Sequence, residues 1–527
     1  MSIVGTNDHH GHIEWLPLLA GHVNNLRALR AGDDGAVLLV DGGDMFQGTL
    51  VSNLGEGAAV IRGYNALEYS AATVGNHEFD FGPVGPANIP QRGADDPRGA
   101  LIARATEADF PLLSANLLDR ETNRPVRWDP IAPRAELVVA GDITVGVIGV
   151  TSVDTLVTTL AGNVADLQVA PLAETIEREA RELRNAGAEV VVVAAHAGGS
   201  CERFDDPGDL SSCRPQEIFR VAEALSAGAV DVIVGGHTHR GMAHVVNDIA
   251  VIESFAYGVA FGRVDLTFDR ASRRVVARTI YPPYFVCNGR GLPPEDCQPP
   301  PYAGRPVVPD PEVAALVAEE FRAVEALQVE PIGVTLNDDF YPASSRESAL
   351  GNLIADLIRE ARSGDVGIVN GGGLRAPLRR GTPTYGEFFE MFPFDNRFAV
   401  AEVSGAELRA LVAEDVQFGG EIYSFGGLEI DARCAGNRLE IGLRTNGRTV
   451  QDADTLRLVL SDFLATGSSP LLGIVRSAGR IEIEDGELMR DALVGLLRAR
   501  GGSLEPLEFF DPSRPRYRYT QRPLRCR

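Results

Sequence analysis

The segment Val190-Val191-Val192-Val193-Ala194-Ala195-His196 decides the fold class. Its unrelieved apolar run predicts a short strand that is buried on both faces, as in a parallel sheet covered by helices. Similar strand-length runs alternate with helical patterns along the first part of the chain: strands at Val37–Val40, Thr144–Val150 and Val230–Val234, and helices at Glu174–Ala186 and Pro215–Ala227. This alternation is typical of a layered α/β domain.

A second domain is expected after a proline-rich stretch, Pro282–Pro311, and an amphipathic helix, Pro311–Leu327. The predicted boundaries are residues 1–305 for the first domain, 306–329 for the linker with its helix, and 330–527 for the second domain. The second domain is also predicted to be α/β: strands at Ile332–Leu336, Val366–Val369, Leu428–Asp431 and Thr455–Leu460, and helices at Leu350–Ala361 and Gly405–Glu414.

The composition excludes several classes of protein. The 527 residues carry a formal net charge of −24, which disfavours a protein that wraps nucleic acid. All 49 basic residues are arginine, so Schiff-base chemistry and a Walker-type phosphate lysine are excluded. No apolar run approaches the roughly 18–20 residues that cross a bilayer. Because Met1–Val4 has the pattern of a first strand, we identify no signal peptide.

The six cysteines fall into three pairs along the chain, Cys201 and Cys213, Cys287 and Cys297, and Cys434 and Cys526. The first two pairs enclose short loops rich in Asp, Pro and Gly, which favours surface disulfides. We therefore expect an exported protein, periplasmic, cell-surface or secreted, with these three pairings. The alternative is six free buried thiols in a cytosolic enzyme.

Residues able to bind metal follow five of the predicted strands. The five motifs are Asp8-His9-His10, Asp41-Gly42-Gly43-Asp44, Gly75-Asn76-His77-Glu78-Phe79-Asp80, His196, and Gly235-Gly236-His237-Thr238-His239. Ligands collect at the carboxyl ends of the strands in a doubly wound sheet, so we expect these motifs to build one site. A turn histidine or a helix cap would explain any single motif, but not all five together.

Side-chain alternation and ligand chemistry sharpen this expectation. Asp8 and His10 are two residues apart and can point the same way, whereas His9 points away. His9, His12 and His22 are expected at the surface or behind the ligands. Oxygen and imidazole ligands without thiolates suit borderline divalent ions such as Zn²⁺ or Mn²⁺.

These motifs resemble the dinuclear metallophosphoesterase superfamily, and the strings 41–48 and 75–80 resemble its 5′-nucleotidase branch, relatives of UDP-sugar hydrolase and ecto-5′-nucleotidase. The resemblance implies a four-layered α/β/β/α calcineurin-like domain followed by an α/β substrate-binding domain. It further implies two metal ions with Asp44 as the bridging ligand. One ion would be held by Asp8, His10, Asp44 and His239, and the other by Asp44, Asn76, His196 and His237.

His77 and Asp80 match the family's catalytic dyad. Two cations about 3.5–4 Å apart clamp the attacking and leaving oxygens of a phosphoryl transfer, and metal-bound water becomes hydroxide near neutral pH. A protonated His77 would stabilise the developing negative charge, and Asp80 would orient its ring. Simple turn capping is the alternative role for Asp80.

The second domain resembles the branch's substrate domain through the strings 348–354, 370–375 and 384–387. Asn370 and Arg375 are then substrate contacts, the arginine pairing with phosphate. Phe463 matches one of the two rings that hold a nucleobase, with Phe425 chosen as the other and Tyr423 a near competitor. Core packing is the alternative for either phenylalanine, and a tight connection without ligand contact is the alternative for the glycine-rich turn.

Two positions depart from the family pattern. Ser469, in Gly467-Ser468-Ser469, stands where relatives carry the aspartate that binds ribose hydroxyls. Ser344 stands where an arginine is expected, which leaves Arg346 as an imperfect replacement. These departures spare the metal chemistry and weaken the assignment of a nucleoside monophosphate.

The leading interpretation is a metal-dependent phosphoester hydrolase of 5′-nucleotidase type that acts on a small nucleotide-like substrate and binds neither nucleic acid nor a membrane. One alternative keeps the enzyme and changes its substrate to a cyclic nucleotide, a UDP-sugar, a sulfur-oxidation thiohydrolase substrate or a non-nucleotide phosphoester. A non-catalytic metal-binding surface protein is a further alternative.

Overall fold

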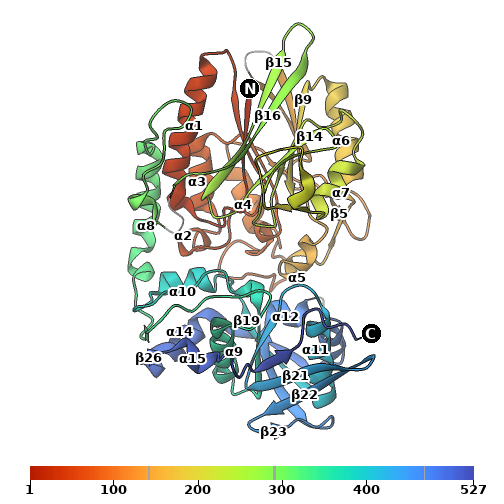
Figure 1. Cartoon of the computed structure of the whole chain (residues 1–527), viewed down its shortest axis with the longest axis vertical. Coiled ribbons are helices and arrows are strands. Elements are labelled where there is room, and N and C mark those ends of the chain that lie inside the picture. The colour runs from red at the N-terminus through yellow and green to blue at the C-terminus, as the bar shows by residue number, and fades with distance from the viewer. Residues whose placement is uncertain (140–142, 289–291, 468, 527) are drawn as a thin grey trace. The chain divides into compact units, whose positions relative to one another are not determined.

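The chain divides into two units, Met1–Ala323 and Val324–Arg527, which are described separately. The structure, a computed structural model, describes residues 1–139, 143–288, 292–467 and 469–526 (Figure 1). Helix α8 (Pro311–Gln328) begins at the proline predicted to start the linker helix.

Two six-stranded sheets form the centre of the first unit. The strand order of the first sheet is β16-β15-β1-β2-β3-β4, and that of the second is β13-β14-β12-β9-β7-β6. The first sheet consists of β1 (Ser2–Thr6), β2 (Val37–Asp41), β3 (Ala71–Thr73), β4 (Leu112–Leu113), β15 (Ala260–Asp269) and β16 (Arg274–Phe285). The second consists of β6 (Arg134–Val139), β7 (Ile143–Thr151), β9 (Val190–His196), β12 (Val232–Gly235), β13 (Gly241–Val246) and β14 (Ile249–Ser254).

The central strands of both sheets are parallel and buried. β1 pairs in parallel with β2, and β9 pairs in parallel with both β7 and β12. All seven residues of β9 are buried, which confirms the strand expected at Val190–Ala195 and its burial on both faces. The remaining elements of this unit are α1 (Leu16–Ala31), α2 (Leu50–Asn53), α3 (Ala58–Leu67), α4 (Gly99–Glu107), α5 (Ala161–Val164), α6 (Leu172–Ala186), α7 (Glu217–Ala224), and the two-stranded ribbons β5 (Leu117–Asp119) with β8 (Leu167–Val169) and β10 (Ser200–Cys201) with β11 (Cys213–Arg214).

The two faces of β9 belong to different hydrophobic clusters. Val190 and Val192 pack with Ile3 and Val40 of the first sheet, so this cluster lies between the sheets. Val191 and Val193 on the other face pack in a cluster with Ile176 of α6 and Ile218 of α7. Helix α1 packs on β2 at the outer face of the first sheet. The layering is therefore α/β/β/α, as expected.

The second unit combines a five-stranded sheet, order β20-β18-β24-β19-β25, with a four-stranded sheet, order β23-β22-β21-β27. Its strands are β17 (Thr335–Leu336), β18 (Val366–Asn370), β19 (Arg397–Ser404), β20 (Tyr423–Gly426), β21 (Leu428–Ala435), β22 (Arg438–Thr445), β23 (Arg448–Thr449), β24 (Thr455–Ser461), β25 (Ile481–Leu488), β26 (Ser503–Leu504) and β27 (Tyr517–Tyr519). Its helices are α9 (Ala349–Ala361), α10 (Tyr385–Met391), α11 (Gly405–Gln417), α12 (Asp462–Thr466), α13 (Pro470–Ser477), α14 (Met489–Arg500) and α15 (Pro506–Phe509).

The strand predicted at Ile332–Leu336 is shorter than expected. Only Thr335–Leu336 forms β17, which pairs with β26. Gly333 has a φ of +84°, a left-handed conformation that interrupts the extended run before it. Apolar character alone predicted five strand residues here, whereas backbone geometry permits two.

Three disulfides join the predicted cysteine pairs, Cys201–Cys213, Cys287–Cys297 and Cys434–Cys526. No cysteine of the described residues is free. The alternative of six buried thiols is therefore wrong. Across the described part of the chain, no helix combines the length and the apolar character needed to span a membrane.

Candidate functional site

Strand ends deliver the predicted ligands of the first unit to the same edge of its two sheets. Asp8 lies just beyond β1 and Asp44 just beyond β2, while His196 is the last residue of β9. Several of these side chains require an unusual backbone. Five of the seven predicted ligands have a positive φ, namely Asp8 (51°), His10 (50°), Asp44 (58°), His237 (79°) and His239 (56°). Non-glycine residues adopt this region at a cost, and such residues cluster at functional sites.

Asp8, His10 and His239 form a first group of ligand-competent side chains. His239 Nε2 lies 3.3 Å from Asp8 Oδ1 and 3.1 Å from His10 Nε2. The amide of Asn7 and the backbone N–H of His237 both donate to Asp8 Oδ2, at 2.7 and 2.8 Å. The His237 N–H also lies 3.1 Å from Oδ1, the oxygen that faces the His239 imidazole.

Asp44, His196 and His237 form a second group. His196 Nε2 lies 3.1 Å from Asp44 Oδ2 and 2.9 Å from Asn76 Oδ1, and His237 Nδ1 lies 3.1 Å from the same Asn76 oxygen. Asp44 Oδ2 is also 3.9 Å from His10 Nε2 of the first group. Asp44 therefore stands between the two groups.

The arrangement of donor atoms fits divalent cations. His10 Nδ1 lies 2.7 Å from the carbonyl oxygen of Gln47, and His196 Nδ1 lies 2.9 Å from that of Gly42. A carbonyl accepts only, so it holds the ring proton on Nδ1 and leaves the Nε2 lone pair facing the carboxylates. This outer support is typical of histidines that ligate metals.

The buried Asp44 carboxylate of the second group is stabilised by positive charge nearby. Burial alone would raise the pKa of Asp44, but the imidazoles of His196 and His77 bring it well below its usual range. Burial alone would lower the pKa of His196, but the Asp44 carboxylate raises it to about 10. In the protein alone, a protonated imidazole thus compensates a buried carboxylate. A bound cation supplies the same compensation.

Two buried glutamates, which the sequence did not single out for a role, hold the ligand turns in place. The Glu78 carboxylate accepts the backbone N–H groups of Asp44, Met45, Phe46 and Gly75. Burial raises the pKa of Glu78 to about 7 and that of Glu253 to about 8. Glu253 accepts the hydroxyl of Thr238, at 2.6 Å, between the ligand candidates His237 and His239. Glu78 belongs to the motif Gly75–Asp80, so the sequence could have drawn attention to it. Glu253 lies within β14, outside every motif identified in the sequence.

His77 and Asp80 form the predicted pair. His77 Nδ1 lies 2.5 Å from Asp80 Oδ2, and the other carboxylate oxygen accepts the hydroxyl of Thr159 at 2.7 Å. The backbone N–H of His77 donates to Asp44 Oδ1 at 2.9 Å. The His77 ring also meets the His10 ring edge to face at a centroid distance of 5.3 Å. The pair is thus physically tied to both ligand groups.

Of the three histidines His9, His12 and His22, two do not lie at the surface. His9 points away from the ligands, as side-chain alternation predicted, but it is buried against the edge of Tyr64. His22 is buried among Phe261, Tyr284 and Tyr302. His12 is partly exposed and contacts the Glu14 carboxylate at 2.7 Å.

In the second unit, Asn370 ends β18, and its register partner on β20 is Tyr423. Asn370 and Arg375 are both partly exposed, on either side of the glycine-rich turn. Phe463 is partly buried in the first turn of α12. Arg346 is exposed in the segment before α9.

Phe425 lies in the hydrophobic core rather than at the surface. Its side chain is 3% exposed and meets the Tyr517 ring edge to face. Tyr423 lies two residues away on the same face of β20, but it is the first residue of the strand and is partly exposed. Phe425 is therefore buried in this structure, and Tyr423 is the more accessible of the two candidate rings.

The two serines at the divergent positions have local structural roles. Ser469 caps α13, its hydroxyl accepting the N–H of Leu472 and donating to the Glu414 carboxylate at 2.7 Å. The Ser344 carbonyl accepts the N–H of Ile422 at 2.8 Å. Ser468, between Gly467 and Ser469, lies outside the described residues.

Comparison with known proteins places both units in described families. Residues 1–241 match the family model for calcineurin-like phosphoesterases, and residues 331–471 match that for the 5′-nucleotidase C-terminal domain. The chain is 26% identical to protein UshA of Salmonella pullorum over 510 residues, covering 89% of this chain and 85% of that protein.

Two further similarities extend the comparison. The chain is 24% identical over 436 residues to endonuclease YhcR of Bacillus subtilis, with 82% of this chain covered but only 33% of that protein. It therefore spans about a third of that relative. The crystal structure of a 5′-nucleotidase precursor from Thermus thermophilus superposes with a TM-score of 0.73 at 24% identity, covering 95% of this chain and 97% of that one. This last match shows a shared two-domain fold.

Proposed function

Because the chain belongs to the 5′-nucleotidase family and is a metal-dependent phosphoester hydrolase, we propose how its own residues carry out hydrolysis of a small nucleotide. The observation that carries the proposal is the pair of ligand groups joined by Asp44 at the ends of buried parallel strands. Thiohydrolase and non-nucleotide substrates are not favoured, since residues 331–471 match the 5′-nucleotidase C-terminal domain.

We assign two divalent ions, Zn²⁺ or Mn²⁺, to the two groups. One ion takes Asp8, His10, Asp44 and His239 as ligands, and the other takes Asp44, Asn76, His196 and His237. Such a pair of ions lowers the pKa of bound water and withdraws charge from phosphoryl oxygens. Imidazole and carboxylate ligands without thiolate favour these metals over a structural zinc knot.

His77 and Asp80 are the proposed catalytic pair. The Asp80 carboxylate holds a proton on His77 Nδ1 and so fixes the orientation of the ring. Protonated at Nε2 as well, His77 donates a hydrogen bond to the oxygen on which negative charge develops. The Thr159 hydroxyl restrains the other oxygen of Asp80, which keeps the carboxylate aligned.

We assign nucleotide recognition to the second unit. Arg375 pairs with phosphate, Asn370 donates or accepts a hydrogen bond, and Phe463 stacks on the base with Tyr423 as the partner ring. Arg346 is retained as a weaker phosphate contact, being exposed. With Ser469 engaged as a helix cap, ribose recognition has lost the carboxylate of the family pattern, so we expect broad tolerance at the sugar.

The net charge of −24 supports a small nucleotide rather than a polymer, because the bound ions and a few aimed arginines supply positive charge locally. The three disulfides are typical of an oxidising compartment, and we propose that the protein is exported.

A panel of nucleoside mono-, di- and cyclic phosphates tests the function. Purified protein with added Mn²⁺ or Zn²⁺ is expected to release phosphate from at least one member, and His77→Ala is expected to lose that activity. Asp154→Asn, an exposed carboxylate in the same unit, serves as the matched control and is expected to behave as wild type. No release from any nucleotide by metal-loaded protein would contradict the proposal.

A further inference from the structure

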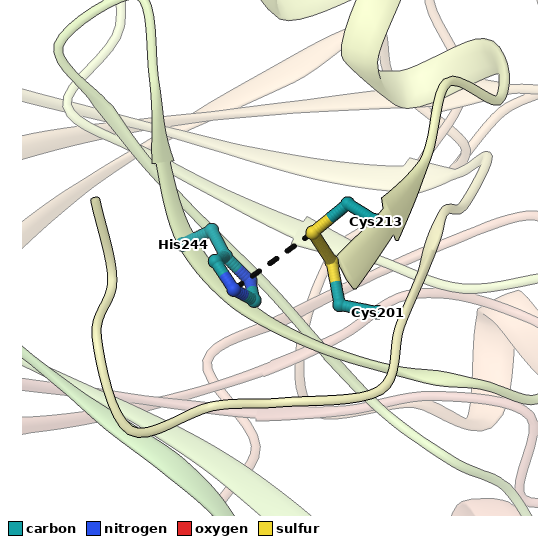
Figure 2. A group of neighbouring side chains, drawn as sticks. All are labelled: Cys201, Cys213 and His244. Atoms are coloured by element: carbon teal, nitrogen blue, oxygen red, sulfur yellow. Dashed lines mark hydrogen bonds between the residues drawn. A yellow bond between two sulfur atoms is a disulfide. The ribbon is translucent and has the colours of Figure 1, made fainter. Parts of the chain in front are cut away.

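The Cys201–Cys213 disulfide joins two residues that face each other directly across the β10–β11 ribbon (Figure 2). Their Cα atoms are 4.0 Å apart, and the cross-link closes a segment with a sequence separation of 12. Cys201 is 6% exposed, whereas Cys213 is partly exposed. An attacking thiol therefore has better access to the sulfur of Cys213.

A buried histidine lies against this disulfide. His244 Nε2 is 3.8 Å from Cys213 Sγ, and the residue is fully buried (Figure 2). Its Nδ1 accepts the backbone N–H of Ala243 at 3.2 Å. A neutral imidazole with Nδ1 as acceptor carries its proton on Nε2, so this N–H lies between Cys213 Sγ and the backbone of Arg203.

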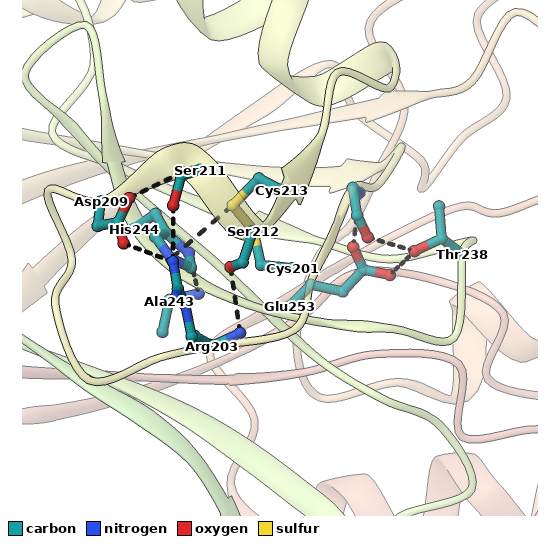
Figure 3. The surroundings of a disulfide bond; sticks show 11 residues. Cys201, Arg203, Asp209, Ser211, Ser212, Cys213, Thr238, Ala243, His244 and Glu253 are labelled. Atoms are coloured by element: carbon teal, nitrogen blue, oxygen red, sulfur yellow. Dashed lines mark hydrogen bonds and ion pairs between the residues drawn. A yellow bond between two sulfur atoms is a disulfide. The ribbon is translucent and has the colours of Figure 1, made fainter.

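The charges around His244 leave its ring neutral. Burial lowers the pKa of His244, and the backbone contact with Arg203 and the carboxylates of Asp209 and Asp206 oppose this shift. Arg203 and Asp209 are paired with each other at 2.8 Å (Figure 3). His244 therefore acts as a neutral N–H donor toward the sulfur.

Cys201, Cys213 and His244 offer three atoms close enough together to suggest a metal site. The chemistry argues against that interpretation, because the two sulfurs are bonded to each other and the nearest nitrogen carries a proton. An N–H donor at a cysteine sulfur instead stabilises a thiolate. Among the described residues, neither of the other two disulfides belongs to a ligand-competent group with histidine.

We propose that Cys201–Cys213 is a thiol-exchange site, with a dithiol as its co-substrate and His244 as the donor to the Cys213 thiolate. One thiolate of the dithiol attacks Cys213 Sγ, the S–S bond breaks, and its electron pair leaves on Cys201 Sγ, which takes a proton. The second thiolate then attacks the dithiol's own sulfur in the mixed disulfide and releases Cys213 as a thiolate. The protein gains two electrons, and the dithiol is oxidised to a disulfide.

The strand that carries Cys201 is tied to the ligand turn. Gly199, two residues before Cys201, donates its N–H to Glu253 at 2.8 Å and accepts the Thr238 hydroxyl on its carbonyl at 2.7 Å. Thr238 lies between His237 and His239, one ligand candidate of each group. Opening the disulfide would loosen this tie and weaken metal retention, so the exchange site regulates the proposed metal centre. This last step rests on the proposed function.

Stepwise reduction tests the exchange site directly. The oxidised protein is equilibrated with increasing dithiothreitol, free thiols are trapped with N-ethylmaleimide, and each cysteine is quantified by peptide mass spectrometry. Cys201 and Cys213 are expected to open at a reductant concentration about tenfold lower than Cys287 and Cys297, the internal control of similar loop length. Opening of the two pairs together, or of the control pair first, would overturn the proposal.

Variants at His244 separate its role from packing. His244→Leu is expected to remove the difference between the two disulfides, while His244→Gln, which keeps an N–H donor, preserves most of it. If His244→Leu does not fold, reduced wild-type protein supplies the test. Cys213 is then expected to react with N-ethylmaleimide at pH 7 about tenfold faster than Cys201, and equal rates would contradict the thiolate assignment.

Metal retention tests the regulatory step by a readout other than activity. Loss of Mn²⁺ or Zn²⁺ to a chelator is expected to be several-fold faster after selective reduction of Cys201–Cys213. Unchanged loss would refute the regulation while leaving the exchange site and the hydrolase intact. Uptake of an additional zinc ion by the reduced protein, abolished in His244→Leu, would identify a metal site instead and overturn the proposal.

Discussion

At the scale of single residues, the site depends on hydrogen-bond partners that fix the tautomer of each histidine ring before any metal or substrate binds. His10 and His196 each present Nε2 because a backbone carbonyl occupies Nδ1. Asp80 does the same for His77, with a carboxylate in place of the carbonyl. Each ring is thereby committed to one tautomer, so its free nitrogen needs no reorganisation to bind or donate.

Asp80→Asn tests this preparation in the proposed catalytic pair. The amide no longer fixes the proton on His77 Nδ1, so we expect kcat to fall by about 10²-fold or more. Metal content measured by mass spectrometry should stay unchanged, since Asp80 is not a proposed ligand. A kcat within twofold of wild type would assign Asp80 to turn capping.

The sequence predicted the direction of side chains where neighbouring residues determine it. It did not predict burial where residues distant in the sequence determine it. The period of two along the strand ends separated Asp8 and His10 from His9, and the structure agrees with that direction. It could not show that His9 is buried against Tyr64, because the ring that covers it lies far along the chain. Nor could it show that Phe425 is buried in the core, because Tyr517, whose ring it meets, lies far along the chain.

At the scale of elements, tight turns after the strands set the ligand positions. Gly75 has no room for a side chain: a Cβ there would lie 2.2 Å from Asp44 Oδ1 and 2.9 Å from His196 Nδ1. The turn therefore requires glycine because the side chains of two proposed metal ligands occupy the space.

Gly75→Ala is expected to displace Asp44 and His196 and to lower metal affinity at least tenfold, as measured by competition with a chelator. Gly93→Ala is the matched control, because no atom lies within 4 Å of a Cβ at that position. Equal metal affinity in the two variants would show that Gly75 does not support the metal centre.

Helix α11 offers a test by pH. Glu407 closes a capping box with Ser404 and forms an ion pair with Arg480. The contact with Arg480 is the larger cause and the hydrogen bond with Ser404 the smaller cause of a pKa of Glu407 lowered to about 2. A lowered pKa stabilises the fold above the unfolded value of about 4.3, and this contribution is lost as pH falls toward 2.

Glu407→Gln should therefore lower the free energy of unfolding near pH 7 by about 1 kcal/mol, a value discounted because the side chain is 23% exposed. Urea denaturation at a series of pH values measures the difference, which should shrink between pH 4 and pH 2. Glu429→Gln, at an exposed strand position, is the control. A difference independent of pH would contradict the assignment.

The boundaries of elements were predictable where patterns were strong. The central strands and α6, α8 and α9 lie within two residues of their expected positions. The length of the strand at Ile332–Leu336 could not be predicted in this way, because it depends on the left-handed conformation of Gly333 and on pairing with β26 from the far end of the chain.

At the scale of the whole molecule, disulfides hold distant segments together. Cys434–Cys526 spans 92 residues and joins β21 to the segment after β27. Closing a loop of this length stabilises a fold by about 4–5 kcal/mol in the chain-entropy model, against about 3 kcal/mol for a loop near 15 residues.

The Cys434→Ser/Cys526→Ser pair is thus expected to lower the melting temperature of the second unit more than Cys287→Ser/Cys297→Ser lowers that of the first. Differential scanning calorimetry measures both. An equal or smaller effect of the long-range pair would show that β27 is held mainly by its neighbours in the sheet.

The central claim is that two divalent ions, held by groups that share Asp44, drive hydrolysis of a nucleotide ester. Its most direct test is phosphate release from a nucleotide that the wild-type enzyme accepts, measured while Mn²⁺ is titrated into protein stripped of metal. We expect no release from stripped protein and activity that saturates at two equivalents of Mn²⁺ per chain. Saturation at one equivalent, or full activity in the stripped protein, would contradict it.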